Sequence, residues 1–240
     1  MYGVRDGGEY TMSGVNQLFW TVIPYIFLMI FVLGMIFRYR YDQFSWTAKS
    51  SELLEKKKLM IGSSLFHIGI IFVFFGHVGG LLVPIEVTEA FGISNHLYHT
   101  IAVWIGGIFG FMAYVGIILL TWRRLSDVRV RSISTFSDIS INIILIIVMS
   151  LGIFSTFFGT SSQPDFNYRE SISIWFRQLF ILQPDGSLMS GVPLLFKLHI
   201  ISAFALLALF PFSRLVHAFS LPIGYIKRRY IIYQKNVVRK

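Results

Sequence analysis

Five long apolar stretches limit what this chain can fold into. Each is close to the roughly 20 residues that a helix needs to cross about 30 Å of hydrocarbon. Backbone groups in hydrocarbon must be satisfied internally, and stretches of this length satisfy them as helices. The sequence therefore predicts an all-α integral membrane protein with five transmembrane helices, at 18–37, 61–83, 97–121, 139–160 and 192–212.

Composition supports a membrane protein. The chain is 55% hydrophobic and 14% charged, whereas soluble domains carry about 25% charged residues. Its net charge of +9 would suggest nucleic acid in a soluble protein, but here we attribute it to basic residues on one membrane side and expect no nucleic-acid partner. The sequence contains no cysteine, which excludes iron–sulfur clusters and thiolate zinc sites within these residues.

Basic residues indicate the orientation in the membrane. With the N-terminus outside, the outer segments hold three Lys and Arg and the inner segments hold seventeen, while Lys197 lies inside the start of the fifth span. The positive-inside rule then predicts an outer N-terminus and a cytoplasmic C-terminus. The inner basic groups either set this topology or form a surface that docks an acidic partner or lipid head groups. They are Lys56–Lys58, Arg123 and Arg124 with Arg129 and Arg131, and Lys227–Arg229.

We divide the chain into an outer N-terminal segment (1–17), a five-helix domain (18–220) and a cytoplasmic basic tail (221–240). Residues 1–11 are polar, and we expect an extension or disorder there. The first apolar run is expected to remain as a span, and the fifth helix has room to continue towards Tyr225. In the outer loop 161–191, SIWFRQLF is either an amphipathic helix on the membrane surface or an ordinary loop helix.

Four histidines lie in or beside two of the apolar spans. His67 and His77 belong to the second span, His199 belongs to the fifth, and His217 follows it. Polar groups in a membrane are costly and mark functional sites. Haem iron takes axial imidazoles, which facing helices of a bundle can supply. We therefore predict two bis-histidine haems that carry electrons; the alternative is neutral, hydrogen-bonded histidines or a proton relay.

The directions of the two helices determine the pairs. The second span runs outward and the fifth runs inward, so His77 pairs with His199 near the outer face and His67 with His217 near the inner face. The spacings differ, because ten residues of helix cover about 15 Å and eighteen cover about 27 Å. A bend in the fifth span, where Pro211 lies between the histidines, would absorb the difference.

Other polar residues near these histidines are candidates for binding. Arg214 lies one turn before His217 and either neutralises a haem propionate or extends to the membrane edge. His96, Tyr98 and His99 lie at the outer end of the third span. Histidine accepts protons near neutral pH, so we consider these three as quinol-site candidates, or else as interfacial residues in water.

Glycines recur every seventh position on the second span, at Gly62, Gly69 and Gly76. Helical-wheel arithmetic places them on a stripe away from His67. Close packing of a neighbouring helix is therefore favoured over clearance for a haem.

Several of these segments resemble one family. FHIGIIFVFFGH, RVRSISTFSD and PFSRLVHAFS, with the two histidine spacings, resemble the gamma subunit of respiratory nitrate reductase over about residues 14–233. The resemblance implies a five-helix dihaem cytochrome b, with His77 and His199 at the distal haem and His67 and His217 at the proximal haem. It also implies an iron–sulfur subunit and a molybdenum catalytic subunit on the inner side. Some members carry a lysine where this chain has HLYHTIAV, so the family's quinol-binding residues do not transfer directly.

The expected function is oxidation of a quinol, which we expect to be menaquinol, near the outer face. Electrons then pass through two b haems to the iron–sulfur subunit, and the proton-motive force increases. Two alternatives are a dihaem cytochrome b of a hydrogenase or formate dehydrogenase, and a haem-free transporter or scaffold with a histidine proton path. The basic inner face favours an inner partner.

Overall fold

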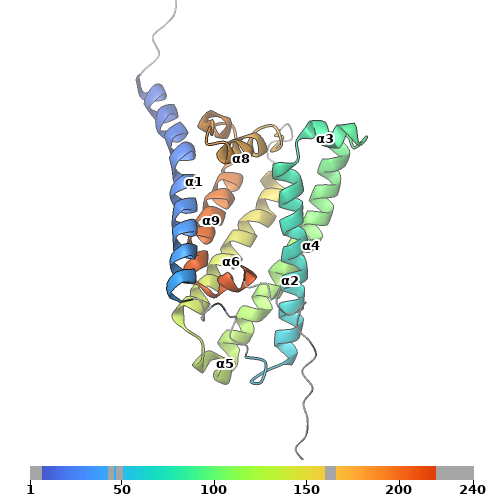
Figure 1. The fold of residues 1–240 in the computed structure, drawn as a ribbon. Helices are drawn as coiled ribbons and strands as arrows, with labels where there is room; N and C mark the ends of the chain where they lie inside the picture. Colours follow the sequence, from blue (N-terminus) through green and yellow to red (C-terminus); the bar gives the residue numbers. More distant parts are fainter. Residues whose placement is uncertain (1–6, 43–45, 47–50, 160–165, 220–240) are drawn as a thin grey trace, which may run out of the picture.

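The computed structural model describes residues 7–42, 46, 51–159 and 166–219, and the regular elements among them are all helices or helical turns. Five helices are long and apolar enough to cross a membrane, and they lie side by side in one bundle (Figure 1). The predicted all-α fold with five such helices is thereby confirmed. The spans are Gly14–Tyr41, Lys57–Leu82, Asn95–Ser126, Phe136–Phe158 and Leu194–Phe212.

Local signals define several of the helix ends. Helix α4 (Asn95–Ser126) begins after Ser94, whose side chain accepts a hydrogen bond from the Leu97 N–H. Helix α6 (Phe136–Phe154) begins with a capping box between Thr135 and Asp138, in which each side chain accepts from the other residue's backbone. Such caps satisfy N–H groups that the first helical turn leaves without partners.

Helix α1 (Gly7–Tyr41) begins inside the stretch 1–11 for which we expected an extension or disorder. The backbone of residues 7–11 is helical, because lengthening an existing helix costs far less than nucleating one. Whether this stretch is an extension stays a prediction. Pro24 lies inside the helix, where a membrane-spanning segment tolerates proline because neighbouring groups satisfy the freed carbonyl.

The helices pack in a spatial order that differs from their order in the chain. Helix α2 (Lys57–His77) packs against α4, α4 against α6, α6 against α9 (Leu194–Leu209), and α9 against α1. A Cβ on Gly69 would lie 2.6 Å from the backbone of α4, and one on Gly62 would lie 3.1 Å from Leu120. These two glycines therefore serve the close packing that we predicted. A Cβ on Gly76 would meet nothing within 4 Å, so for this residue the prediction was wrong.

The fifth span does not continue as one helix. Helix α9 ends at Leu209 and is followed by two 3-10 turns, η5 (Phe210–Phe212) and η6 (Arg214–Phe219), with Ser213 extended between them. Pro211 has no N–H to donate and its ring clashes with the preceding turn, which ends the helix. The bend that we expected at Pro211 is confirmed. Continuation of the helix through residues 210–219 was wrong, and residues 220–225 lie outside the described part.

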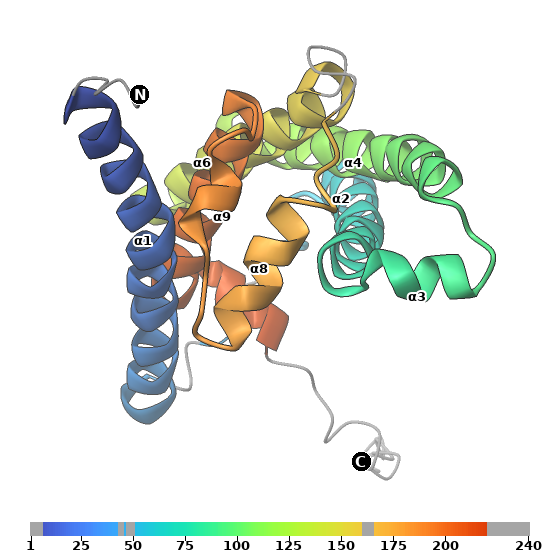
Figure 2. The same cartoon turned by 90° about the horizontal axis from the view of Figure 1, so that it is seen from above.

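One end of the bundle is covered by the connection between α6 and α9, and we call it the α8 end. Helix α8 (Ile172–Phe180) lies across it, between α1 and the turn η2 (Val78–Leu82) that follows α2 (Figure 2). Trp175 is fully buried against Trp20 of α1, and its Nε1–H donates to the Trp20 carbonyl oxygen. The helix expected for SIWFRQLF is thus confirmed, and its apolar side packs onto the protein itself.

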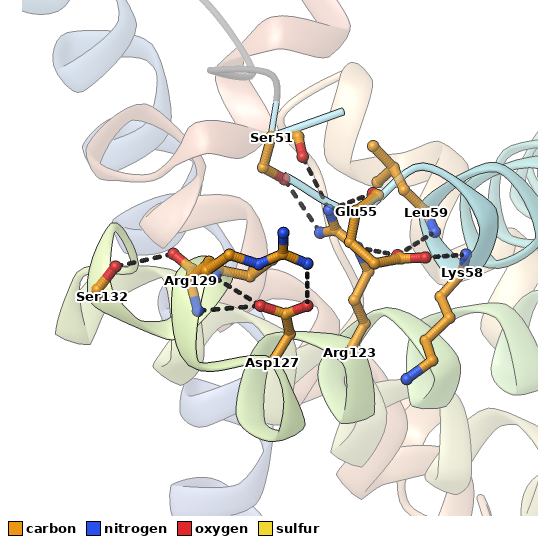
Figure 3. Close-up of polar contacts among 9 residues, drawn as sticks. Ser51, Glu55, Lys58, Leu59, Arg123, Asp127, Arg129 and Ser132 are labelled. Carbon is orange, nitrogen blue, oxygen red and sulfur yellow. Dashed lines mark hydrogen bonds and ion pairs between the residues drawn. The ribbon is translucent and has the colours of Figure 1, made fainter. Parts of the chain in front are cut away.

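The opposite end carries basic residues at the start of α2 and around α5 (Val128–Ser132), and we call it the basic end. Here Arg123 is 3% exposed. It donates to the Glu55 carboxylate at 2.8 Å, and to the carbonyl oxygens of Glu55 and Ser51 (Figure 3). The pKa of Glu55 is held below its usual value, first by the Lys58 N–H and also by Arg123.

Two arginines of the basic groups are therefore used inside the fold. Arg123 holds the segment before α2, and Arg124 pairs with the buried Asp138 at 3.4 Å. Carboxylates of this chain already pair with Arg123 and Arg124, which reduces what these two residues can contribute to the docking surface that was one of the two interpretations of the basic groups. Among the described residues, the exposed basic side chains of this surface are Lys56, Lys57, Lys58, Arg129 and Arg131. The Lys227–Arg229 group lies outside the described part.

Candidate functional site

Four histidine side chains meet in two pairs across the bundle. The rings of His77 and His199 lie 6.2 Å apart between centroids, at the α8 end. The rings of His67 and His217 are also 6.2 Å apart, towards the basic end. These are the two pairs that the helix directions predicted, and each joins α2 to the chain segment of the fifth span.

The break after α9 makes the second pair geometrically possible. His199 lies in α9, whereas His217 lies in η6, beyond Pro211 and the extended Ser213. A straight helix would carry His217 about 12 Å too far along the bundle to match the spacing on α2. The interruption instead brings His217 back to the level of His67.

Each of the four rings is oriented by a hydrogen bond from Nδ1 to a backbone carbonyl. His67 and His77 bond to the carbonyl oxygens of Ser63 and Val73, each at 2.8 Å. His199 bonds across to Val148 on α6 at 3.0 Å, and His217 bonds to Arg214. A carbonyl accepts only from a protonated nitrogen, so in neutral imidazole these bonds place the lone pair on Nε2. This is the arrangement in which histidine ligates a metal.

The ring spacing fits one metal ion between each pair. Metal–imidazole bonds are about 2 Å long. Two such bonds and the radii of the two rings separate the centroids by about 6 Å, which matches the observed spacing. Among the described residues no group of three or more His, Cys, Asp or Glu could hold a metal ion. Two protein ligands suffice for haem, because the porphyrin supplies the other four, so these residues fit two haems.

Gly152 on α6 gives His199 the space that it occupies. A Cβ built on Gly152 would lie 2.9 Å from Cε1 of the ring. Real Cβ atoms do not come so close, so a larger residue would displace the imidazole. Helix α6 therefore positions His199 through two contacts: the space at Gly152 and the hydrogen bond to the Val148 carbonyl.

Arg214 is engaged by a carboxylate of this chain. Its Nε donates to Asp138 Oδ1 at 2.6 Å, and the Asp138 side chain is 3% exposed. Asp138 therefore accepts from Arg214 and Arg124 together. The role of Arg214 at a haem propionate stays a prediction, and the structure adds a buried partner that sequence reasoning missed. The TFSD segment, with a threonine three residues before an acid, indicates only the capping box at the start of α6 and not the pairing of Asp138 with Arg214.

At the α8 end, the three quinol-site candidates differ in their surroundings. Tyr98 is half-buried, and its Oη would lie 3.1 Å from a Cβ on Gly79, two residues after His77. His99 is half-buried with its ring 6.5 Å from that of Tyr168. His96 is exposed. Tyr98 and His99 therefore lie closer than His96 to the elements that surround the His77–His199 pair.

Arg169 organises this end and was not singled out from the sequence. It is 2% exposed, and its guanidinium lies 4.0 Å from the Tyr98 ring centroid. It donates to Asn95 Oδ1, to Thr88 Oγ1 and to the carbonyl oxygens of Val83 and Pro84, at 3.1–3.3 Å. Its Nε has no hydrogen-bond partner among the residues that the structure describes. In the sequence it is one basic residue in a polar loop, and nothing local distinguishes it.

Two further side chains of the same connection hold the segment that follows His77. Ser173 donates to the Gly80 carbonyl at 2.8 Å, and Arg177 donates to that of Leu81 at 3.3 Å. Because η2 leaves the α-helical pattern, these carbonyls need other donors. The α8 region therefore fixes the end of α2 on which His77 lies.

Comparisons with known proteins agree on one family. A family model described as nitrate reductase gamma subunit matches residues 16–236. The nitrate reductase gamma chain of Bacillus subtilis (strain 168) is 49% identical over 225 residues, which cover 94% of this chain and 100% of that one. The respiratory nitrate reductase 2 gamma chain of Escherichia coli (strain K12) is 38% identical over 223 residues, which cover 92% and 98%. The nitrate reductase-like protein NarX of Mycobacterium tuberculosis (strain ATCC 25618 / H37Rv) is 43% identical over 92% of this chain and 34% of its own length.

Proposed function

This chain belongs to the nitrate reductase gamma subunit family, and on that basis we propose that it is a dihaem cytochrome b that oxidises a quinol. It is a multi-pass bacterial membrane protein and the membrane subunit of a nitrate reductase, an oxidoreductase complex. The observation that carries the proposal is the pair of 6.2 Å imidazole spacings along the bundle. Menaquinol is the quinol that we expect.

The four histidines would hold the two haems. When bound, each haem would supply a one-electron carrier between the quinol and an inner iron–sulfur partner. The chain keeps the four rings ready for ligation through their Nδ1 bonds to carbonyl oxygens. Ligands fixed in this way do not have to reorganise when the charge at the site changes.

The quinol would bind at the α8 end, beside the His77–His199 pair. Oxidation of a quinol releases two protons, and in this proposal His99 would accept them and the exposed His96 would help to pass them to water. The Tyr98 hydroxyl is a hydrogen-bond donor near the end of α2. The guanidinium of Arg169 over the Tyr98 ring adds positive charge to this end of the bundle. Positive charge there favours the deprotonated form of a bound quinol oxygen.

The basic end would face the cytoplasm. The excess of Lys and Arg there supports this orientation through the positive-inside rule. The exposed basic side chains, Lys56–Lys58 with Arg129 and Arg131, would meet acidic surfaces of the iron–sulfur and molybdenum subunits. A reporter fused after Phe219, the last residue that the structure describes, should be found on the cytoplasmic side. A reporter found on the outer side would contradict this orientation.

Reduced-minus-oxidised spectra of membranes that contain single His→Ala variants test the haem proposal. Loss of His77 or His199 should remove one b-type haem, and loss of His67 or His217 should remove the other. His96→Gln is the matched control, because it changes a histidine outside both pairs and should retain both haems. Wild-type membranes without b-type bands, or bands that survive in the His67→Ala, His77→Ala double variant, would contradict the proposal and favour a haem-free transporter or scaffold.

Quinol oxidation by the assembled complex tests the second part. His99→Gln and Tyr98→Phe should slow electron delivery from menaquinol while leaving both haem spectra intact. Chemical reduction of the haems by dithionite should be unaffected. Unchanged quinol kinetics in both variants would move the site elsewhere.

A further inference from the structure

We propose that Asp138 is a positioning residue for His217, and that it thereby sets the reduction potential and the imidazole orientation of the His67–His217 haem. This proposal rests on the proposed function. The carboxylate has no place in the haem-ligand set. It is nevertheless buried near the basic end, at the start of a membrane-spanning helix, where an isolated charge would be costly. Its contacts lead directly to the segment that carries His217.

The first step is the attachment of Asp138 itself. One oxygen, Oδ2, accepts from the Thr135 N–H at 2.9 Å, and the other, Oδ1, accepts from Arg214 Nε at 2.6 Å. The capping box thus fixes the carboxylate relative to the axis of α6. Arg124 of α4, 3.4 Å from Oδ2, holds it from the other side.

The second step is the path from Asp138 to the ligand. The backbone carbonyl of Arg214 accepts the hydrogen bond from His217 Nδ1. The Arg214 residue is therefore held by α6 through its side chain and orients the imidazole through its backbone. The turn that contains both residues, η6, is short and follows an extended residue, so it lacks the support that α9 gives to His199.

The third step is the charge around this ligand. Asp138 contributes one negative charge to two arginines, so the cluster carries a net charge of about +1. Replacement of the carboxylate by an amide would leave two arginine charges beside the segment of His217. Positive charge near a haem favours its reduced form, and desolvation makes such charges more effective.

Redox titration of membranes that contain the full chain tests this proposal. In Asp138→Asn, the reduction equilibrium of the His67–His217 haem should shift about tenfold towards the reduced form, or about 59 mV for one electron. The His77–His199 haem should keep its potential and serves as an internal reference. Asp138→Glu should restore most of the wild-type potential, because it keeps the charge.

A second variant separates position from charge and applies even if Asp138→Asn fails to accumulate. Arg214→Lys keeps the positive charge but lacks the Nε–H that bonds to Asp138. It should change the low-spin ferric EPR signal of the same haem, which reports the orientation of the two imidazole planes, with little change in potential. Glu55→Gln is the matched control, because it breaks an arginine–carboxylate pair at the same end without touching this segment.

The outcomes are distinct. If wild-type membranes contain both haems, and the variants change neither the potential nor the EPR signal, the positioning role alone is overturned. Equal changes in both haems, or the same changes in Glu55→Gln, would also overturn it, because they indicate general loosening of the fold. Wild-type membranes without haem would instead overturn the proposed function.

Discussion

Gly152 and His199 touch so closely that the imidazole occupies the place of a side chain at position 152. A Cβ there would lie 2.9 Å from Cε1 and 3.3 Å from Nδ1 of the ring. The ring cannot simply turn away, because its Nδ1 bonds to the Val148 carbonyl on the same helix. The position of one proposed haem ligand therefore depends on a missing side chain on another helix.

Gly152→Val should weaken the haem at the His77–His199 pair. Overpacking of this kind costs about 1–3 kcal/mol, and every 1.4 kcal/mol is about tenfold in an equilibrium. Difference spectra should show loss of this haem, with the His67–His217 haem retained. Gly106→Val is the control, because a Cβ at Gly106 meets nothing within 4 Å. Full retention of both haems in Gly152→Val would show that the ring has room to move.

Gly69→Ala should loosen the packing of α2 on α4. Its Cβ would lie 2.6 Å from the Ala113 nitrogen and the Phe109 carbonyl oxygen, and backbone atoms cannot yield as a flexible side chain can. We expect a loss of about 1–3 kcal/mol in the free energy of unfolding, measured in detergent by tryptophan fluorescence. Gly106→Ala, the control, should unfold with the same free energy as the wild type, because a Cβ there meets nothing within 4 Å. Equal stability of the two variants would mean that the helices can separate without cost.

Arg169→Leu should destabilise the α8 end. It removes donors from the carbonyl oxygens of Val83 and Pro84 and from Thr88 Oγ1, and a buried acceptor without a partner costs about 1–3 kcal/mol. Thermal unfolding should occur at a lower temperature, and the His77–His199 haem should be lost first. Arg177→Leu is the milder comparison, because Arg177 donates one bond to Leu81. A larger effect of Arg177→Leu would refute the central role of Arg169.

Tyr168 should remain protonated well beyond the usual range of tyrosine. Burial raises its pKa to about 12; Tyr98 adds to the rise and Arg169 opposes it. A raised pKa stabilises the fold fully below pH ~10, the pKa of an unfolded tyrosine, and this contribution is lost as the pH rises towards 12. The difference in phenolate absorbance between wild type and Tyr168→Phe should therefore titrate near 12. A difference that titrates like an ordinary tyrosine would show that the ring is open to water.

Local properties of the chain were enough for the outline of this fold. Hydropathy along the sequence placed all five spans, because crossing a membrane depends on the length and composition of each segment alone. The direction of successive spans alternates, so the pairs His77–His199 and His67–His217 followed without knowledge of any contact. Pro211 marked the bend for a local reason as well, since a proline inside a helix removes one hydrogen bond and crowds the preceding turn, which kinks or breaks the helix.

The tertiary structure decided how these parts are held. The use of Arg123 and Arg124 inside the fold, the burial of Arg169, the link from Asp138 through Arg214 to His217 and the close approach of Gly152 to His199 all join segments distant in sequence. Hydropathy and spacing describe each segment by itself. Which carboxylate meets which arginine, and where a side chain must be absent, depends on which helices become neighbours and on the distance between them.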